Sequence, residues 1–115
     1  KSDSAPKLLA GTGKDQVHLL LVLNSDRGLA GAFNSNIVKA ARDKALSLQA
    51  EGKTVRFFLV GRKGRPVIAR LFPGQIVEQY ETTGMRSIGF EQAREIADQL
   101  MGMFDAGAFD VAHLF

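Results

Sequence analysis

A chain of 115 residues with 45% hydrophobic residues is long enough to form one domain with its own packed core. It contains no cysteine, which excludes disulfides, thiolate catalysis and cysteine metal sites within these residues. The net charge of +3 is a small basic excess that could steer an acidic partner, and no run approaches the ~20 apolar residues of a membrane span.

The first predicted element is an apolar strand, Val17–Leu23, which reads VHLLLVL. It shows no polar alternation after His18, which favours a strand buried on both faces of a parallel sheet. Residues 1–16 carry Gly11, Gly13 and several polar residues, and we expect them to form an entry linker. His18 has no acidic or histidine neighbour within its strand, so we interpret it as a structural residue.

A helix is predicted after the turn that follows this strand. Its pattern begins near Asn34 or Ser35, either of which could cap it, and reaches Glu51. A second strand, Thr54–Val60, comes next, and the basic turn Gly61–Pro66 follows it. The apolar residues that recur at helical spacing form the inward stripe of the helix: Ile37, Val38, Ala41, Ala45 and Leu48.

A short helix and a third strand are predicted next. Pro66 suits the first turn of the helix, because proline has no amide hydrogen to lose there. The side chains expected to pack inward are Val67, Ile68 and Leu71. Residues Gln75–Tyr80 read as a strand, and we expect it at an edge of the sheet because polar residues interrupt it.

A last helix and a last strand complete the pattern. The helix is predicted over Phe90–Phe104, and Asp110–Phe115 reads as the opening of a fourth strand, so we expect the chain to be a fragment of a longer protein. The inward face of the helix is expected to carry Ala93, Ile96, Ala97, Leu100 and Phe104. Strands that alternate with helices indicate an α/β domain with a mainly parallel sheet and right-handed crossovers.

The turn between the first strand and the first helix is where a nucleotide would bind in such a sheet. Gly28 and Gly31 fall short of the dinucleotide fingerprint, which needs three glycines at fixed offsets. Asp26 would repel phosphate, and its side chain could accept the backbone N–H groups of the turn. We therefore interpret the turn as a structural clamp. The alternative is an NADP-like dinucleotide module that uses the Asp26–Gly31 turn, with Arg62 and Lys63 facing a 2′-phosphate.

Residues 21–34, LVLNSDRGLAGAFN, resemble the signature of the gamma subunit of rotary ATP synthases. Three later segments agree with that family in order and spacing: FLVGRKG at 58–64, the helix ending in Phe104, and GAFDV at 107–111. Ala30 stands where the family often has cysteine, and Ala32 where it has one of its glycines. The matched signature positions are Asp26, Arg27, Gly28, Leu29, Gly31 and Asn34.

The resemblance implies a three-layer Rossmann-like domain over residues 17–115 that binds no nucleotide, other cofactor or metal. It implies a non-catalytic part of the central stalk, which transmits torque between the proton-driven c ring and the catalytic alpha and beta subunits in ATP synthesis. The implied neighbours are the epsilon subunit and the c-subunit ring, with alpha and beta reached through shaft helices that this sequence lacks. The domain would lie peripherally on the cytoplasmic face of a bacterial energy-transducing membrane, or on the matrix side of a mitochondrial one.

Two other function classes find less support in the residues. A catalytic function finds little support, because the sequence has no cysteine, no histidine pair and no nucleophile-elbow pattern. Nucleic-acid binding finds little support, because the sequence offers few exposed aromatic side chains on which bases could stack. The only tyrosine is Tyr80, and most phenylalanines fall on faces predicted to be buried. The basic residues Arg62, Lys63 and Arg65 are candidates for partner docking, and a solvated basic loop is the alternative.

Overall fold

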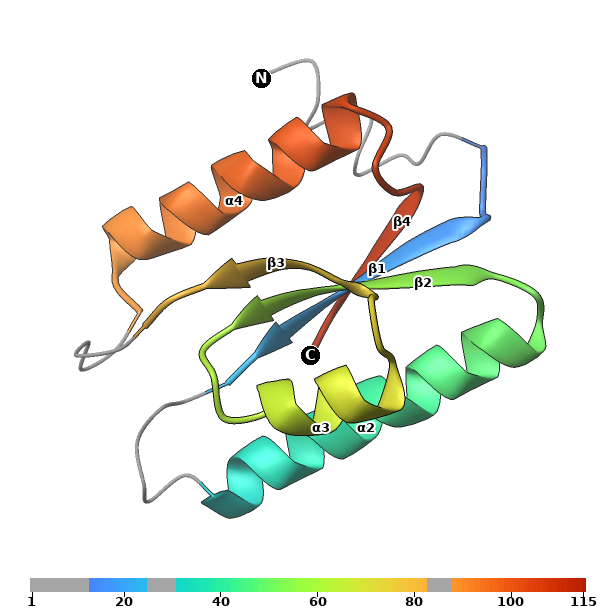
Figure 1. The fold of residues 1–115 in the computed structure, drawn as a ribbon. Helices are drawn as coiled ribbons and strands as arrows, with labels where there is room; N and C mark the ends of the chain where they lie inside the picture. Colours follow the sequence, from blue (N-terminus) through green and yellow to red (C-terminus); the bar gives the residue numbers. More distant parts are fainter. Residues whose placement is uncertain (1–12, 25–30, 83–87) are drawn as a thin grey trace.

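The computed structural model describes residues 13–24, 31–82 and 88–115, without the side chains of residues 31–34. The linker predicted for residues 1–16 lies mostly outside the described residues. Strands and helices alternate along the described chain (Figure 1). The elements are β1 (Val17–Leu23), α2 (Gly31–Ala50), β2 (Thr54–Val60), α3 (Arg65–Leu71), β3 (Ile76–Tyr80), α4 (Phe90–Asp105) and β4 (Val111–Leu114).

The strands form one parallel sheet in the order β3-β2-β1-β4. The register pairs Val17 of β1 with Thr54 of β2, and His18 of β1 with Val111 of β4. The chain extends the sheet in one direction through β2 and β3 and then returns to place β4 on the other side of β1. The α/β class, the parallel sheet and the edge position of β3 are therefore confirmed.

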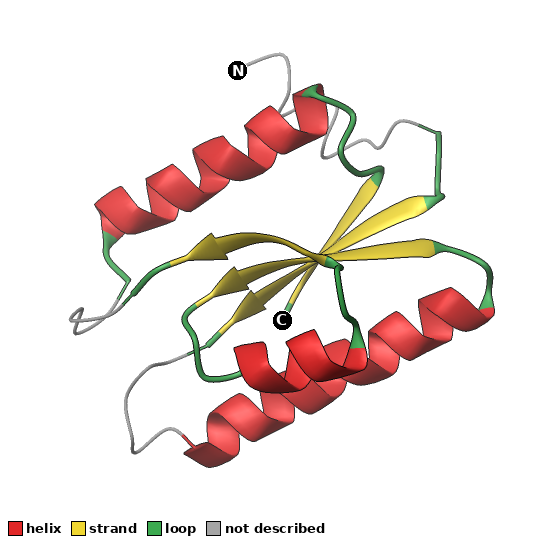
Figure 2. Ribbon diagram, viewed as in Figure 1, coloured by secondary structure: helices red, strands yellow, loops and turns green. Residues whose placement is uncertain are grey.

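Helices cover both faces of the sheet, with α2 and α3 on one side and α4 on the other (Figure 2). Successive side chains of a strand point to opposite faces, so Leu20 and Val22 pack toward α2, whereas Leu19 and Leu21 pack toward α4. This is why the sequence of β1 is apolar without alternation. The prediction of a Rossmann-like three-layer domain is confirmed.

The first helix begins earlier than its sequence predicts. Helix α2 starts at Gly31, so Asn34 and Ser35 lie inside it and neither caps its first turn. A side-chain cap contributes only about 1 kcal/mol, and three further helical residues can outweigh it. The cap prediction for these two residues was wrong.

The predictions that three further side chains face inward were also wrong. Leu71, the last residue of α3, is 44% exposed, and Phe72 fills the space beneath the helix instead, at 1% exposure. Ala93 and Ala97 of α4 are exposed. Helix α4 is the one described helix on its face of the sheet, and it meets the strands along a narrow stripe through the buried Ile96 and Phe104.

The amino end of β1 is fastened by a carboxylate from the far end of the chain. Asp110 Oδ2 accepts the backbone N–H groups of Gln16 and Val17 at 3.0 and 2.9 Å. The Val17 amide, assisted by that of Gln16, holds the pKa of Asp110 below its usual 3.8. A lowered pKa in the folded state means that this carboxylate contributes stability above about pH 4, which is lost as the pH falls further.

We expect Asp110→Asn to lower the urea midpoint of unfolding at neutral pH, and Asp110→Ala to lower it more, because asparagine keeps one acceptor oxygen. The difference between wild type and Asp110→Asn should shrink as the pH falls below about 4, where the wild-type carboxylate is protonated too. Asp98→Asn, on the exposed side of α4, is the matched control. Equal midpoints for Asp110→Asn and Asp98→Asn would contradict the assignment.

Candidate functional site

The candidate site lies at the carboxyl edge of the sheet, where the loops after β1 and β2 meet. Asn24, directly after β1, donates its backbone N–H to Val60 O at 2.7 Å. Gly61 follows β2 with φ of +84° and donates to Tyr80 O at 3.0 Å. A Cβ at Gly61 would lie 2.6 Å from Asn24 O, so the two loops meet at a distance that only glycine permits.

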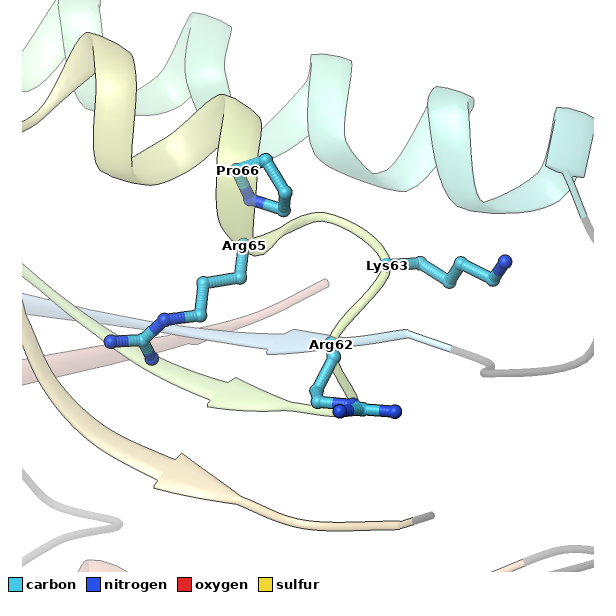
Figure 3. A pocket seen from close by; sticks show the side chains of 4 residues that line it. All are labelled: Arg62, Lys63, Arg65 and Pro66. Atoms are coloured by element: carbon cyan, nitrogen blue, oxygen red, sulfur yellow. The ribbon is translucent and has the colours of Figure 1, made fainter. Parts of the chain in front are cut away.

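A basic loop follows Gly61, formed by Arg62, Lys63 and Arg65. With Pro66 these residues line an open cleft of about 450 Å³ (Figure 3). Lys63 and Arg65 extend to opposite sides of the loop, so their charges do not converge on one point (Figure 3). The cleft offers positive charge and exposed surface, which suit an acidic partner more than an enclosed small molecule.

The conformation of the basic loop is held by β3. The guanidinium of Arg65 donates through Nη1 to Gln79 Oε1 at 2.8 Å, and Gln79 Nε2 donates to Gly61 O at 2.8 Å. Arg62 Nε lies 3.8 Å from Glu81 Oε1, and both of those side chains are more than half exposed. Exposed ion pairs contribute little stability. The contact between Arg62 and Glu81 therefore adds little to the stability of the loop.

The turn predicted to act as a clamp is only partly described. Asp26, Arg27, Gly28 and Leu29 lie outside the described residues, and Gly31 and Asn34 stand in the first turn of α2 without described side chains. Asn24, at the start of the turn, is buried at 8% exposure, and its amide N and O have no hydrogen-bond partner among the described residues. The clamp therefore stays a prediction.

His18 is not the isolated histidine that its strand suggested. Its Nδ1 lies 2.9 Å from Nε2 of His113 in β4, and its Nε2 lies 2.6 Å from a carboxylate oxygen of Asp15. The expectation that His18 has no acidic or histidine neighbour was wrong, because Asp15 lies three residues before it and His113 lies 95 residues away along the chain. Only the parallel pairing of the first and last strands brings the two rings together.

No metal-binding cluster appears in the part of the chain that the structure describes. Residues 13–24, 31–82 and 88–115 hold no group of three histidine, aspartate or glutamate side chains that could bind a metal ion. In the same residues, no helix is both long and apolar enough to cross a membrane.

Comparison with known proteins shows the family to which the chain belongs. The family model described as ATP synthase matches residues 1–115, the whole of the sequence. The chain belongs to this ATP synthase family. A protein of Sphingopyxis alaskensis named "ATP synthase gamma chain" is 78% identical over 114 residues. A protein of the same name from Rhizorhabdus wittichii is 60% identical over 111 residues.

This ATP synthase family chain covers only part of its relatives. It is matched over 99% and 96% of its own length by these two proteins, and it spans 39% and 38% of theirs. It shares its fold with the rotor of Euglena gracilis mitochondrial ATP synthase at a TM-score of 0.57 and 16% identity, over 99% of this chain and 36% of that one. The relatives' names give no support to the NADP-like dinucleotide module considered as an alternative.

Proposed function

We propose that this chain is a non-catalytic domain of the central stalk of an ATP synthase. Its work is to transmit torque between a proton-driven c ring and the catalytic sites of alpha and beta subunits. The observation that carries the proposal is the 78% identity over 114 residues to a protein named ATP synthase gamma chain. The likeness of the fold to an ATP synthase rotor supports it.

The packing of the domain suits a part that must transmit force without deforming. Most residues of β1 and β2 are buried, with apolar side chains on both faces of the sheet. Polar contacts tie the layers and loops together: the Tyr80 hydroxyl donates to Glu95 on α4, and Arg56 Nη1 donates to Ala108 O at 3.0 Å. Because close-packed interiors resist compression, a force applied to one side of such a domain is transmitted to the other side with little deformation.

The signature turn has a structural part in this proposal. We assign Asp26, Arg27, Gly28, Leu29 and Gly31, the positions that match the family signature, to a structural clamp. Asn34 follows in the first helix. The close approach of Gly61 to Asn24 supports this placement, because it anchors the start of the same turn. Residues 17–115 form the domain, residues 1–16 lead into it, and shaft helices lie outside it.

The basic loop is the proposed docking surface for the epsilon subunit or the c ring. Arg62 and Lys63 extend into solvent beyond the sheet, and their positive charge fits acidic groups on a partner. The domain is placed peripherally, on the cytoplasmic face of a bacterial membrane or the matrix side of a mitochondrial one. Alpha and beta subunits are reached through the shaft.

The function is tested by titrating the 115-residue chain with the epsilon subunit, and in parallel with Mg-ATP and with NADP. Saturable binding of epsilon without binding of either nucleotide is the expected result. Binding of a nucleotide alone would overturn the proposal in favour of a dinucleotide-binding module. Failure to bind epsilon would overturn the placement of an epsilon-docking surface within these residues.

Removing the exposed charges should weaken epsilon binding. We expect Arg62→Gln with Lys63→Gln to raise the Kd about fivefold or more, since rim charges contribute up to about 1 kcal/mol each. The dependence of the Kd on salt should also become shallower. Arg65 is kept, so the hydrogen bond that it donates to Gln79 still holds the loop.

The control removes the same amount of charge elsewhere. Lys39→Gln with Arg94→Gln takes one exposed cation from each face of the sheet and should leave the Kd unchanged. If both double variants weaken binding equally, net charge and not the basic loop governs docking. If neither does, the basic loop is not the epsilon surface, and the rotor assignment is then judged by the titration of the unaltered chain.

A further inference from the structure

The chain has two histidines, and the structure brings them together. His18 of β1 is 5% exposed, and its ring stacks on that of His113 of β4 with centroids 5.1 Å apart and planes 16° apart. His18 is paired in register with Val111, and His113 with Leu20, so the contact joins the two strands diagonally. Both rings lie on the α2 side of the sheet, as Leu20 does.

The contact with Asp15 fixes which nitrogen of His18 carries a proton. His18 Nε2 lies 2.6 Å from Asp15 Oδ1, and an ionised carboxylate can only accept, so Nε2 carries a hydrogen. Asp15 is ionised at neutral pH, because the hydrogen bonds from Lys53 and His18 hold its pKa below the usual 3.8. His18 Nδ1 is then the atom that faces His113 Nε2 at 2.9 Å.

Only one of the two facing ring nitrogens can carry a hydrogen at this short distance. When both imidazoles are neutral, His113 Nε2–H donates to the lone pair of His18 Nδ1. One added proton is tolerated, because the other ring nitrogen of His113 can take it. A second added proton places an N–H on both facing nitrogens and turns the hydrogen bond into a repulsion between two cations.

The charges around the pair oppose that second proton. Burial, His18 and Lys44 on α2 all lower the pKa of His113, and the carboxylate of Asp15 opposes them. Lys53 lies beyond Asp15, with Nζ 3.2 Å from Oδ2. Two further charged groups lie nearby: Asp110, directly before β4, interacts with His18, and Lys14, before β1, interacts with the Asp110 carboxylate.

Strand β4 is the element that this contact can release. Among the described strands, β1 is the one that it pairs with. Its last residue, Leu114, is 69% exposed. The attachment of β4 within the described sheet therefore depends on its contacts with β1.

We propose that His18 and His113 form a proton-sensitive latch that holds β4 on β1 at neutral pH and loosens as the pH falls. A histidine whose pKa is lowered on folding binds fewer protons than it does in the opened state. Stability of the β1–β4 contact is therefore full above about pH 6.5 and is lost as the pH falls from there toward the lowered pKa of His113.

Hydrogen exchange at amides of β4 and its neighbours tests the latch. The reporters are the N–H of Phe115, bonded to Leu21 O at 2.9 Å, and that of Leu23, bonded to Phe115 O at 2.9 Å. After correction for intrinsic exchange, we expect their protection to fall by up to about tenfold per pH unit below 6.5. Amides that join β1 to β2 should keep theirs.

Two further measurements keep the test decisive. In His113→Gln, which has no titrating ring at that site, the loss of protection with acid should disappear. In the wild type, ring ¹⁵N shifts should show that His113 takes up its proton below pH 6.5. Titration of the His113 ring at 6.5 or above, constant protection of Phe115 and Leu23 down to about pH 5, or an equal loss throughout the sheet would each overturn the proposal.

Discussion

Replacing Phe57 by alanine is expected to lower the free energy of unfolding by about 3–5 kcal/mol. Phe57 is in the middle of β2 and has no exposed surface. Its ring meets that of Phe72 with centroids 5.0 Å apart, between the sheet and α3. Alanine leaves a cavity there that the neighbouring strands cannot fill without moving. Urea unfolding followed by circular dichroism measures the loss.

The control for Phe57→Ala is Phe90→Ala. Phe90 is 77% exposed at the first residue of α4, so its loss should change the free energy of unfolding by no more than about 0.5 kcal/mol. A domain that typically has about 5–15 kcal/mol of stability can lose most of it through the first substitution and almost none through the second. Similar losses from both would contradict the placement of the core between β2 and α3.

The buried strands were the part of the fold that the sequence predicted best. Val17–Leu23 and Thr54–Val60 were predicted with the bounds that the structure has, because their apolar runs end at polar or glycine residues. The helix boundaries were harder, since a cap at Asn34 competes with a few residues of further helix and the two differ by about 1 kcal/mol. The side chain of Leu71 was predicted to face inward from its helical spacing alone. It is exposed in the structure, because Leu71 is the last residue of α3.

The candidate site was predictable only where it follows from the order of elements. Arg62 and Lys63 had to lie at the carboxyl edge of the sheet, because they come directly after a parallel strand. The hydrogen bond from Arg65 to Gln79 could not be foreseen, since it depends on the register of β3, which shifts between Phe57 and Phe58 of β2. The ring contact between His18 and His113 likewise needs β4 beside β1, a placement that no local pattern reveals.

Replacing Gly61 by alanine is expected to lower the free energy of unfolding by about 3 kcal/mol. A left-handed backbone costs a non-glycine residue about 1–2 kcal/mol, and Gly61 has φ of +84°. The added Cβ would also lie 2.6 Å from Asn24 O, so one of the two backbone segments must move. Forcing extra atoms into a packed site costs a further 1–3 kcal/mol or so. Urea unfolding measures the total.

Gly74→Ala separates the two causes. Gly74 has φ of +76°, close to that of Gly61, but a Cβ there meets nothing within 4 Å. Its loss should therefore be the conformational cost alone, about 1 kcal/mol. The excess for Gly61→Ala then measures how tightly the loop after β2 is held against the end of β1. Because Arg62 and Lys63 follow Gly61 directly, Gly61→Ala should also weaken epsilon binding under conditions where the variant is folded, whereas Gly74→Ala should not. Equal losses of stability for the two variants would mean that the loops part readily and that the basic loop is not rigidly placed.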